Sequence, residues 1–381
     1  TAVPTVLLVE NAGTLLDLPR AAIEPALTVL ADRKLIVVRD DLISLASLFE
    51  DEQLIAKKLR ALAGQILPAG QPDFEGLAED QRDALTKAMS SGVFILTGAP
   101  GTGKTYTIKR IITSFPEARV ALAAPTGKAA KRIFEQSGLK AYTIHKLLEP
   151  QMQDGHFIFT RNAENPITAD LVVVDEMSMV DVSLMARLLE ALAPSTRLIL
   201  VGDTYQLPSV GAGNILKDAI ASGVIPTTEL TIIKRQDEGL IIRNCHRIKN
   251  GEDITLGNSS AKDFFVLKRD SEEAIRDALL ELVGRRLAES YGVHPLREVQ
   301  VICPLREKTS LSCKALNTEF QQRLNTQPPV EGSRFRVGDK VIQNKNEYDK
   351  EIINGDIGYV LEIDARARTL TVAFENPERI V

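Results

Sequence analysis

The stretch that most constrains the fold of this chain is Gly98-Ala99-Pro100-Gly101-Thr102-Gly103-Lys104-Thr105. An apolar run at 93–97 precedes it and predicts a buried parallel strand, and residues 106–112 after it predict a helix. A strand, a Gly-x-x-x-x-Gly-Lys-Thr loop and a helix in this order are typical of a phosphate-binding loop. This context disfavours the alternative of a chance glycine-rich turn.

Each part of this loop has a physical task in holding a nucleotide. Its glycines let the backbone curl so that N–H groups point at an anion, and the helix N-terminus adds partial positive charge. Lys104 supplies a mobile charge for the β- and γ-phosphates, and the Thr105 hydroxyl is a ligand for Mg²⁺. The expected nucleotide-binding residues here are Gly98, Pro100, Gly101, Thr102, Gly103, Lys104 and Thr105.

Composition narrows the class of protein without identifying it. Hydrophobic residues make up 44% and charged residues 25% of the 381 positions, which is ordinary for a globular chain of two to four domains. The net charge of −5 neither indicates nor excludes nucleic-acid binding, because a local basic groove decides that. With three cysteines in no C-x-x-C pair, no signal-peptide pattern and no membrane-length apolar run, we expect a cytoplasmic protein without a zinc site or disulfide frame.

An acidic pair is the second strong signal. Four apolar residues at 171–174 bring Asp175 and Glu176 to the end of a predicted strand. We expect Asp175 to hold Mg²⁺ and Glu176 to orient and deprotonate an attacking water. The alternative, a plain acidic turn, loses weight beside the phosphate-binding loop.

Further strands are predicted at 119–124, 197–201 and 229–233, and polar residues follow each of them. Open α/β sheets bind ligands at the carboxyl ends of their strands. After the first of these strands, backbone N–H groups, Thr126 and Lys128 could hold the phosphates of a nucleic-acid strand. A helix N-terminus with solvated lysines explains the same residues equally well.

Four single residues carry weaker signals. Gln206 follows the strand predicted at 197–201 and can touch both a γ-phosphate and a neighbouring domain. Arg235 is a candidate arginine for binding the γ-phosphate. Gln81 lies seventeen residues before the glycine loop and could read an adenine edge. His145 could stack or hydrogen-bond, although a lone histidine is more often structural.

The pattern along the chain predicts an α/β protein of four parts. They are a helical, winged-helix-like domain at 1–75, a first motor domain at 76–233 with a β-hairpin at 151–166, a second α/β domain at 234–329 and an SH3-like barrel at 330–381. In the first part we expect helices at 16–30 and 42–62 around a strand at 34–39, and a plain helical scaffold without DNA contact explains this pattern at least as well as a winged-helix-like module. In the third we expect strands at 264–267 and 299–304 and a helix at 272–290.

Seven motifs follow one another in a fixed order. They are Gln81, GAPGTGKT from Gly98, APTGKAAKR from Ala124, TIHKLL from Thr143, VVVDEMSMVD from Val172, VGDTYQLPSVGAG from Val201 and KRQ from Lys234. This set resembles the superfamily 1 helicases, and specifically the RecD-like group (relatives of the exodeoxyribonuclease V alpha subunit). The resemblance covers roughly residues 77–375.

The resemblance implies two RecA-like motor domains, the second only partial here, with ATP and Mg²⁺ in a cleft and single-stranded DNA across the top, moved 5′ to 3′. The hairpin at 151–166 is similar to a strand-separating pin. By matching position, the resemblance implies that Gln81 contacts adenine and that Lys104 and Thr105 hold phosphates and magnesium. It implies that Asp175 holds the metal, that Glu176 is the catalytic base, and that Gln206 and Arg235 sense the γ-phosphate. The residues implied to lie along DNA are Pro125, Thr126, Gly127, Lys128 and His145. Implied partners are single-stranded DNA, duplex junctions and recombination or repair subunits, with no membrane.

The family pattern continues where this sequence does not. A later DNA-contacting motif resembling VHKSQG, and a last motif with a second arginine finger, do not occur before Val381. We therefore expect a fragment that binds Mg-ATP but hydrolyses it slowly. Two alternatives remain: a nucleotide-gated DNA-binding protein without turnover, and a P-loop ATPase acting on a small molecule.

Overall fold

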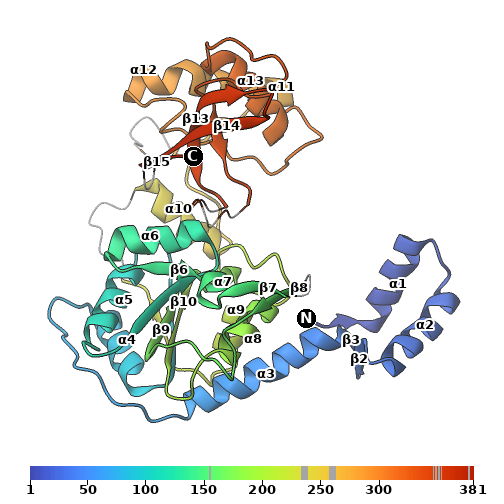
Figure 1. Cartoon of the computed structure of the whole chain (residues 1–381), viewed down its shortest axis with the longest axis vertical. Helices are drawn as coiled ribbons and strands as arrows, with labels where there is room; N and C mark the ends of the chain where they lie inside the picture. The colour runs from blue at the N-terminus through green and yellow to red at the C-terminus, as the bar shows by residue number, and fades with distance from the viewer. Residues whose placement is uncertain are drawn as a thin grey trace. The chain divides into compact units, whose positions relative to one another are not determined.

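The computed structural model describes residues 1–153, 156–232, 239–256, 263–345, 347, 350, 352, 354–375 and 378–381. These residues form two compact units, Thr1–Thr255 and Leu256–Val381, which are described one at a time (Figure 1). Within these ranges, no helix combines the length and the apolar character that a membrane span requires.

The first unit begins with two helices and a small antiparallel sheet. Its elements are β1 (Val3–Pro4), α1 (Thr5–Leu16), α2 (Arg20–Asp32), β2 (Ile36–Arg39) and β3 (Leu42–Leu45), and the strand order is β1-β3-β2. The strand expected at 34–39 and the turn after it are present. The helix expected from residue 42 is wrong in its first four residues, because these turn back to pair with β2 as β3. The helix then runs as α3 (Ala46–Ala63).

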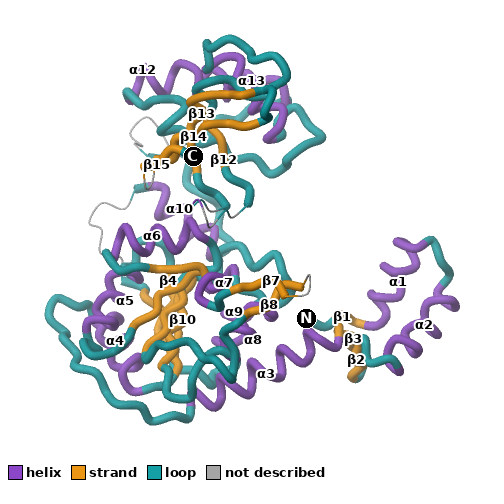
Figure 2. Tube along the Cα trace, in the orientation of Figure 1, coloured by secondary structure: helices purple, strands orange, loops and turns teal. Residues whose placement is uncertain are grey.

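A six-stranded parallel sheet forms the centre of this unit (Figure 2). The strand order is β11-β4-β10-β9-β5-β6, and the strands are β4 (Val93–Gly98), β5 (Val120–Ala124), β6 (Ala141–Thr143), β9 (Leu171–Val174), β10 (Arg197–Gly202) and β11 (Thr227–Leu230). The strands expected at 93–97, 119–124, 171–174 and 197–201 are therefore confirmed. The strand expected at 229–233 corresponds to β11, but β11 begins earlier and ends at Leu230, and 231–232 form no strand. Every residue of β4, β9 and β10 is buried, as uninterrupted apolar runs predict.

Helices cover both faces of this sheet. Along β4, Val93 and Ile95 belong to the core shared with α3, α7 (Ile144–Leu147), α8 (Val182–Glu190) and α9 (Ile215–Ala221). The alternate residues Phe94 and Leu96 belong to the core shared with α4 (Glu79–Ser90), α5 (Lys104–Thr113) and α6 (Gly127–Ser137). The alternation follows from the two-residue period of a strand, and it makes the sheet a rigid layer between two cores.

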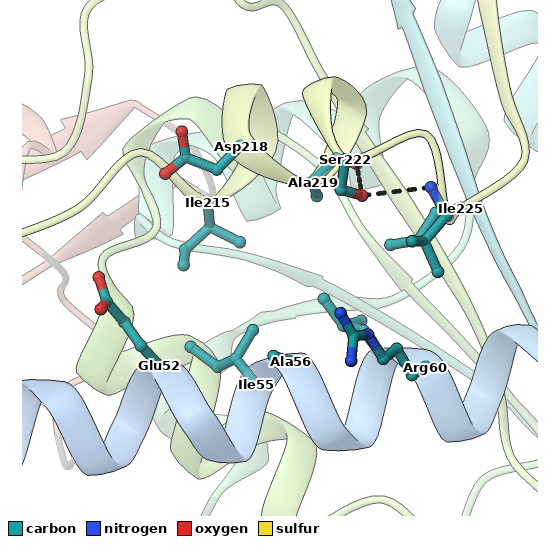
Figure 3. Close-up of a pocket in the computed structure, with 11 residues that line it drawn as sticks. Glu52, Ile55, Ala56, Arg60, Ile215, Asp218, Ala219, Ser222 and Ile225 are labelled. Atoms are coloured by element: carbon teal, nitrogen blue, oxygen red, sulfur yellow. Dashed lines mark hydrogen bonds between the residues drawn. The ribbon is translucent and has the colours of Figure 1, made fainter.

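Helix α3 fastens the amino-terminal elements to this layered core. Asp51 is buried, and its carboxylate accepts hydrogen bonds from Ser183 Oγ at 2.9 Å and Arg187 Nη2 at 2.6 Å, both in α8. Across a cavity of about 240 Å³, Ile55 of α3 faces Ile215 of α9 (Figure 3). None of the residues lining this cavity belongs to the phosphate-binding loop.

A β-hairpin of two strands, β7 (Pro150–Gln153) and β8 (His156–Phe159), follows α7 outside the main sheet. The expected hairpin is thus confirmed. An ion pair of 2.8 Å between Arg161 Nη2 and Glu149 Oε1 clamps its base, and Thr160 N–H donates to the Glu149 carbonyl. Arg161 holds the pKa of the Glu149 carboxyl below its usual range through this hydrogen bond.

After β11, α10 (Leu240–Lys249) completes the regular elements of the first unit. The second unit contains α11 (Glu272–Glu281), a π-helical turn at 282–286, α12 (Leu287–Tyr291) and α13 (Cys313–Leu324). Its antiparallel sheet has the order β12-β13-β14-β15, with β12 (Lys340–Ile342), β13 (Ile357–Asp364), β14 (Thr369–Glu375) and β15 (Glu378–Ile380). The helix expected at 272–290 and the hairpin expected around 365–368 are both confirmed.

Two expected strands of this unit are wrong. Among its described residues, 264–267 and 299–304 form no strand, and Ile302 is 91% exposed. A strand requires a neighbour for its backbone hydrogen bonds, and the sheet described here pairs only β12 to β15. This four-stranded sheet is joined to α13 by a side-chain contact, because Asn325 at the end of α13 donates to Asp339 Oδ1, just before β12, at 2.7 Å.

Arg197, the first residue of β10, is a buried guanidinium that holds three main-chain carbonyls. It donates to the carbonyl oxygens of Ser91 at 2.9 Å, Pro68 at 3.1 Å and Met89 at 3.1 Å. Its guanidinium also lies 4.5 Å from the Phe115 ring centroid. It thereby ties the segment before α4 to the amino edge of the sheet.

We predict that Arg197→Met lowers the free energy of unfolding of the first unit by about 2–4 kcal/mol, because three buried acceptors lose their donor. Urea unfolding followed by circular dichroism measures the change. Arg119→Met is the matched control, since Arg119 is an exposed arginine before β5 that pairs with Asp170 at 2.7 Å. Equal destabilisation by both substitutions would contradict this role of Arg197.

Candidate nucleotide-binding site at the carboxyl edge of the sheet

The parallel sheet brings four separate sequence segments to one edge. Strands β4, β10, β9 and β5 take consecutive positions in the sheet, and each ends at the same edge because all run in one direction. The phosphate-binding loop follows β4, the acidic pair follows β9, the Gln206 loop follows β10 and the Thr126 segment follows β5. The topology therefore assembles the predicted residues at the place where open α/β sheets bind ligands.

The loop after β4 has the backbone that its glycines predict. Gly98, Gly101 and Gly103 have φ angles of 154°, 85° and 90°, which L side chains rarely adopt. Thr102 is buried, and its hydroxyl donates to the Ala99 carbonyl at 2.8 Å, which fixes the inside of the curl. Helix α5 begins at Lys104, so its first N–H groups face the loop.

The Lys104 side chain folds back over this loop. Its ammonium donates to the carbonyl oxygens of Gly98 at 2.6 Å and Ala99 at 3.2 Å. Burial lowers the pKa of Lys104, and the negative charges of Asp203, Asp175 and Glu176 oppose that shift. A polyanion entering the loop would offer this ammonium stronger acceptors than two neutral carbonyls.

The acidic pair after β9 lies within electrostatic reach of this lysine. Burial raises the pKa of Asp175 to about 6 and the neighbouring Glu176 charge adds to the rise, while the Glu176 N–H, Lys104 and Arg132 oppose it. Glu176 N–H donates to Asp175 Oδ1 at 2.8 Å. Glu176 itself has φ 56° and ψ 40°, a left-handed conformation that is costly for a glutamate and that clusters at functional sites.

The same residues fit a magnesium ion. A hydroxyl at Thr105 and a carboxylate at Asp175 are oxygen donors, and Mg²⁺ bound with substrate phosphates uses only one or two protein ligands. The groups that oppose the raised pKa of Asp175 do not cancel the effect of burial, and a divalent cation would add to their compensation of its charge.

Gln81, in the first turn of α4, lies against the phosphate-binding loop. Its Oε1 accepts from Ala78 N–H at 3.2 Å, and its Nε2 is buried without a hydrogen-bond partner. A Cβ atom added to Gly103 would lie 2.9 Å from this Nε2. Since buried amide donors are nearly always satisfied, the free N–H of Gln81 is a feature that a bound ligand would explain.

Asp203, directly after β10, was missed by the sequence reasoning. It is 5% exposed, its charge acts on Lys104, and its Oδ1 accepts from Tyr205 N–H at 2.9 Å. The position of Asp203 relative to β10 repeats that of Asp175 relative to β9, and that parallel is the signal that could have found it. The Gln206 side chain, two residues after the buried part of this loop, is exposed.

The loop after β10 closes onto the start of α8. A Cβ atom on Gly211 would lie 2.1 Å from Asp181 Oδ2, so the backbone approaches this side chain as closely as only glycine allows. Asp181 caps α8 by accepting from Leu184 N–H at 2.8 Å, and Val182 N–H donates to the Ala212 carbonyl at 3.0 Å. The loop and the first turn of α8 are therefore one packed piece.

Arg235 lies outside the described residues, so its predicted role stays a prediction. The helix after that gap, α10, contacts two parts of the candidate site. Lys249 lies 4.4 Å from the Tyr205 ring centroid and pairs with Glu229 at 2.7 Å. Ile242 Cδ1 would lie 3.8 Å from a Cβ atom on Gly101.

The candidate DNA residues lie at the β5–β6 side of the same edge. Ala124 and Thr143 pair in register, so Pro125 to Lys128 and His145 leave adjacent strand ends. Thr126 Oγ1 accepts from Ala129 N–H at 3.2 Å and caps α6, whereas Lys128 is exposed. The hydroxyl that was expected to grip a phosphate thus also has a structural task.

His145 packs on the hairpin, with its ring centroid 5.9 Å from that of Phe159, and burial lowers its pKa. Nearby, Lys140 and Lys146 lie 5.3 Å and 5.8 Å from the Tyr142 ring centroid. These lysines add positive charge to the edge strand β6, and the sequence reasoning did not select them.

Two protein-family models match this chain. One is described as an AAA domain and matches residues 76–267, which is half of the chain. The other is described as an ATP-dependent RecD-like DNA helicase SH3 domain and matches residues 316–374. Together they cover the parallel sheet, its phosphate-binding loop and most of the small antiparallel sheet.

Curated relatives agree with these matches. The chain is 37% identical over 310 residues to the ATP-dependent RecD2 DNA helicase of Deinococcus radiodurans, covering 79% of this chain and 40% of that protein. It is 34% identical over 362 residues to the RecBCD enzyme subunit RecD of Mycolicibacterium smegmatis, covering 84% and 65%. The chain thus spans less than two thirds of either relative. The Pif1 helicase from Bacteroides, solved with ADP-AlF3 and ssDNA, aligns with a TM-score of 0.47 and 20% identity, covering 80% of this chain and 73% of that one.

Two aspartates at opposite ends of β9 make a matched test of the site electrostatics. Arg119 lowers the pKa of Asp170 to about 2, whereas burial raises that of Asp175 to about 6, from an ordinary value of 3.8. Folding therefore favours the ionised form of Asp170 and the protonated form of Asp175. The Asp175 carboxylate should destabilise the fold increasingly as pH rises from about 4 to 6, and fully above that.

We predict that Asp175→Asn raises the free energy of unfolding at pH 7 by about 2 kcal/mol, and that this gain disappears toward pH 4. Asp170→Asn should lower the free energy of unfolding at pH 7, and this loss should become smaller below about pH 3. Thermal melts of the two variants across this pH range measure both effects. A loss of stability in Asp175→Asn at pH 7 would contradict this prediction, because it would show that neighbouring groups already stabilise the Asp175 carboxylate.

Proposed function

Because this chain belongs to the RecD-like helicase family, we propose that it is the ATP-driven motor portion of a 5′–3′ DNA helicase and translocase. ATP and Mg²⁺ bind at the carboxyl edge of the six-stranded sheet. The observation that carries the proposal is the partly buried Lys104 ammonium, which lies on the phosphate-binding loop and interacts with the charges of Asp175, Glu176 and Asp203.

Nucleotide binding follows from groups that are already in place. Lys104 exchanges the Gly98 and Ala99 carbonyls for oxygens of the β- and γ-phosphates, which are stronger acceptors. The loop N–H groups and the α5 N-terminus hold the rest of the phosphate charge. The unsatisfied amide donor of Gln81 pairs with the adenine edge.

Hydrolysis needs a metal ligand and a base. Thr105 and Asp175 would hold Mg²⁺, which when bound neutralises charge on the phosphate oxygens. With that cation bound, the Asp175 carboxylate would stay ionised at neutral pH despite its burial. Glu176 orients the attacking water and accepts its proton. Gln206 and Arg235 sense the γ-phosphate, and Arg235 does so from outside the described residues.

Single-stranded DNA lies along the loops after β5 and β6, in contact with Pro125, Thr126, Gly127, Lys128 and His145. Support comes from the register that places these loops side by side and from the lysines around Tyr142. Unwinding of a duplex with a 5′ tail, but not of one with a 3′ tail, is the signature of the proposed direction.

The setting of this motor is also a proposal. One relative is named as a subunit of the RecBCD enzyme, so we propose that partner subunits for recombination or repair join this chain. We place the activity in the cytoplasm, where ATP and DNA junctions are available.

We predict that Lys104→Ala weakens Mg-ATP binding by about 10–100-fold, because a charge-assisted hydrogen bond to phosphate is lost. Lys109→Ala is the matched control, since Lys109 is an exposed lysine one turn later on α5. Titration with a fluorescent ATP analogue measures binding, and phosphate release with and without oligo-dT measures turnover.

Unchanged binding in Lys104→Ala would overturn the nucleotide site. Turnover that single-stranded DNA raises in the parent chain would support the helicase. Binding of both ligands with nucleotide-dependent DNA affinity but no turnover would instead favour a nucleotide-gated DNA-binding protein.

For the DNA track, Lys128→Ala should lower the affinity for oligo-dT several-fold at low salt and reduce the slope of log affinity against log salt by about 0.7. Fluorescence anisotropy across a salt series measures both values. Lys57→Ala, at an exposed position of α3, is the control that should change neither. Equal slopes of log affinity against log salt for Lys128→Ala and the parent chain would show that Lys128 does not contact the DNA.

A further inference from the structure

Two of the three cysteines lie in contact in the second unit, outside the segments that form the candidate nucleotide site. The Cys303 and Cys313 sulfur atoms are 3.2 Å apart, and both residues are only partly buried. The third, Cys245, is exposed on α10 in the first unit. We propose that Cys303 and Cys313 form a reversible disulfide that closes the loop at 304–312 against the first turn of α13.

The fold has already brought the two ends of this loop together. Cys313 N–H donates to the Leu305 carbonyl at 2.9 Å, and Lys314 N–H donates to the Arg306 carbonyl at 3.1 Å. Ser312, which is buried, caps α13 and holds Cys313 as its first helical residue. Because these contacts fix the backbone beside both thiols, bond formation requires only a small further approach of the sulfur atoms.

The loop is also tied at its middle and remains open to reagents. Ser310 Oγ donates to Glu272 Oε2 at 2.8 Å, which joins the loop to the start of α11. Arg306, Glu307 and Lys308 on the loop are exposed. A small disulfide in solution can therefore reach the pair, in contrast to a thiol sealed in a core.

The chemistry balances with a low-molecular-weight disulfide such as oxidised glutathione as the oxidant. One protein thiol loses its proton and attacks a glutathione sulfur, which breaks the glutathione S–S bond and releases one glutathione as thiol. The second protein thiol, also deprotonated, attacks the mixed disulfide and releases the other glutathione. Two electrons and two protons pass from the cysteines to the two glutathiones, and excess thiol reverses both steps.

The hydrogen bond with Cys313 raises the pKa of the Cys303 thiol. The pair should therefore react faster as the pH rises from 7 to 9, as thiolate exchange requires. This chemistry is independent of the proposed helicase activity, so its test does not depend on ATP or DNA.

The test uses the full chain with oxidised glutathione, followed by alkylation, trypsin and mass spectrometry. Trypsin cuts at Arg306 and Lys308, so it separates Cys303 from Cys313, and the peptides 298–306 and 309–314 stay joined only through a disulfide. We expect this linked pair, a fall from three free thiols to one, and recovery of all three with dithiothreitol. Cys245→Ser should form the same link, whereas Cys303→Ser and Cys313→Ser should form none.

Oxidation in urea separates positioning by the fold from chance pairing. The folded chain should give at least about tenfold more linked peptide than the unfolded chain at equal time. Links to Cys245, stable glutathione adducts on Cys303 or Cys313, or equal yields with and without urea would each overturn the proposal.

Discussion

The burial of opposite charges at one edge of a parallel sheet is the constraint on which this structure depends. Strands β4, β9 and β10 are buried on both faces and end side by side, so the groups just beyond them share a space with little water. Burial lowers the pKa of Lys104 and raises that of Asp175. A further partner of opposite charge would therefore stabilise the charged form of each group. The phosphates of a nucleotide would do this for Lys104, and the accompanying cation would do it for Asp175.

Much of the first unit could be predicted from the sequence because its signals are local and agree with one another. Uninterrupted apolar runs predicted β4, β9 and β10, and the residue types after each strand end predicted the site. The gathering of these residues could be predicted without knowing the strand order, since all strands of a parallel sheet end at the same edge. One family model matches residues 76–267, which contain these strands and the residues after them, and one relative aligns with 79% of the chain.

The misses share a different cause, which is pairing or burial that the local sequence does not encode. Residues 42–45 have helical spacing, yet they form β3 because the turn before them presents β2 as a partner. Residues 299–304 have the apolar character of a strand, yet no neighbouring strand pairs with them in the described part of the unit. Asp203 follows β10 as Asp175 follows β9, but a single carboxylate is a weaker local signal than an acidic pair, and its burial is evident only in the fold.

The close approach of Gly211 to Asp181 has a mechanical consequence. Gly211 packs against the carboxylate whose other oxygen caps α8, so any side chain at position 211 would have to displace that capping residue. Helix α8 in turn holds Asp51 of α3 through Ser183 and Arg187, and α3 continues from β3 at the amino-terminal end. The loop after β10 and the amino-terminal elements are thus joined by an unbroken series of contacts, although they lie far apart in the sequence.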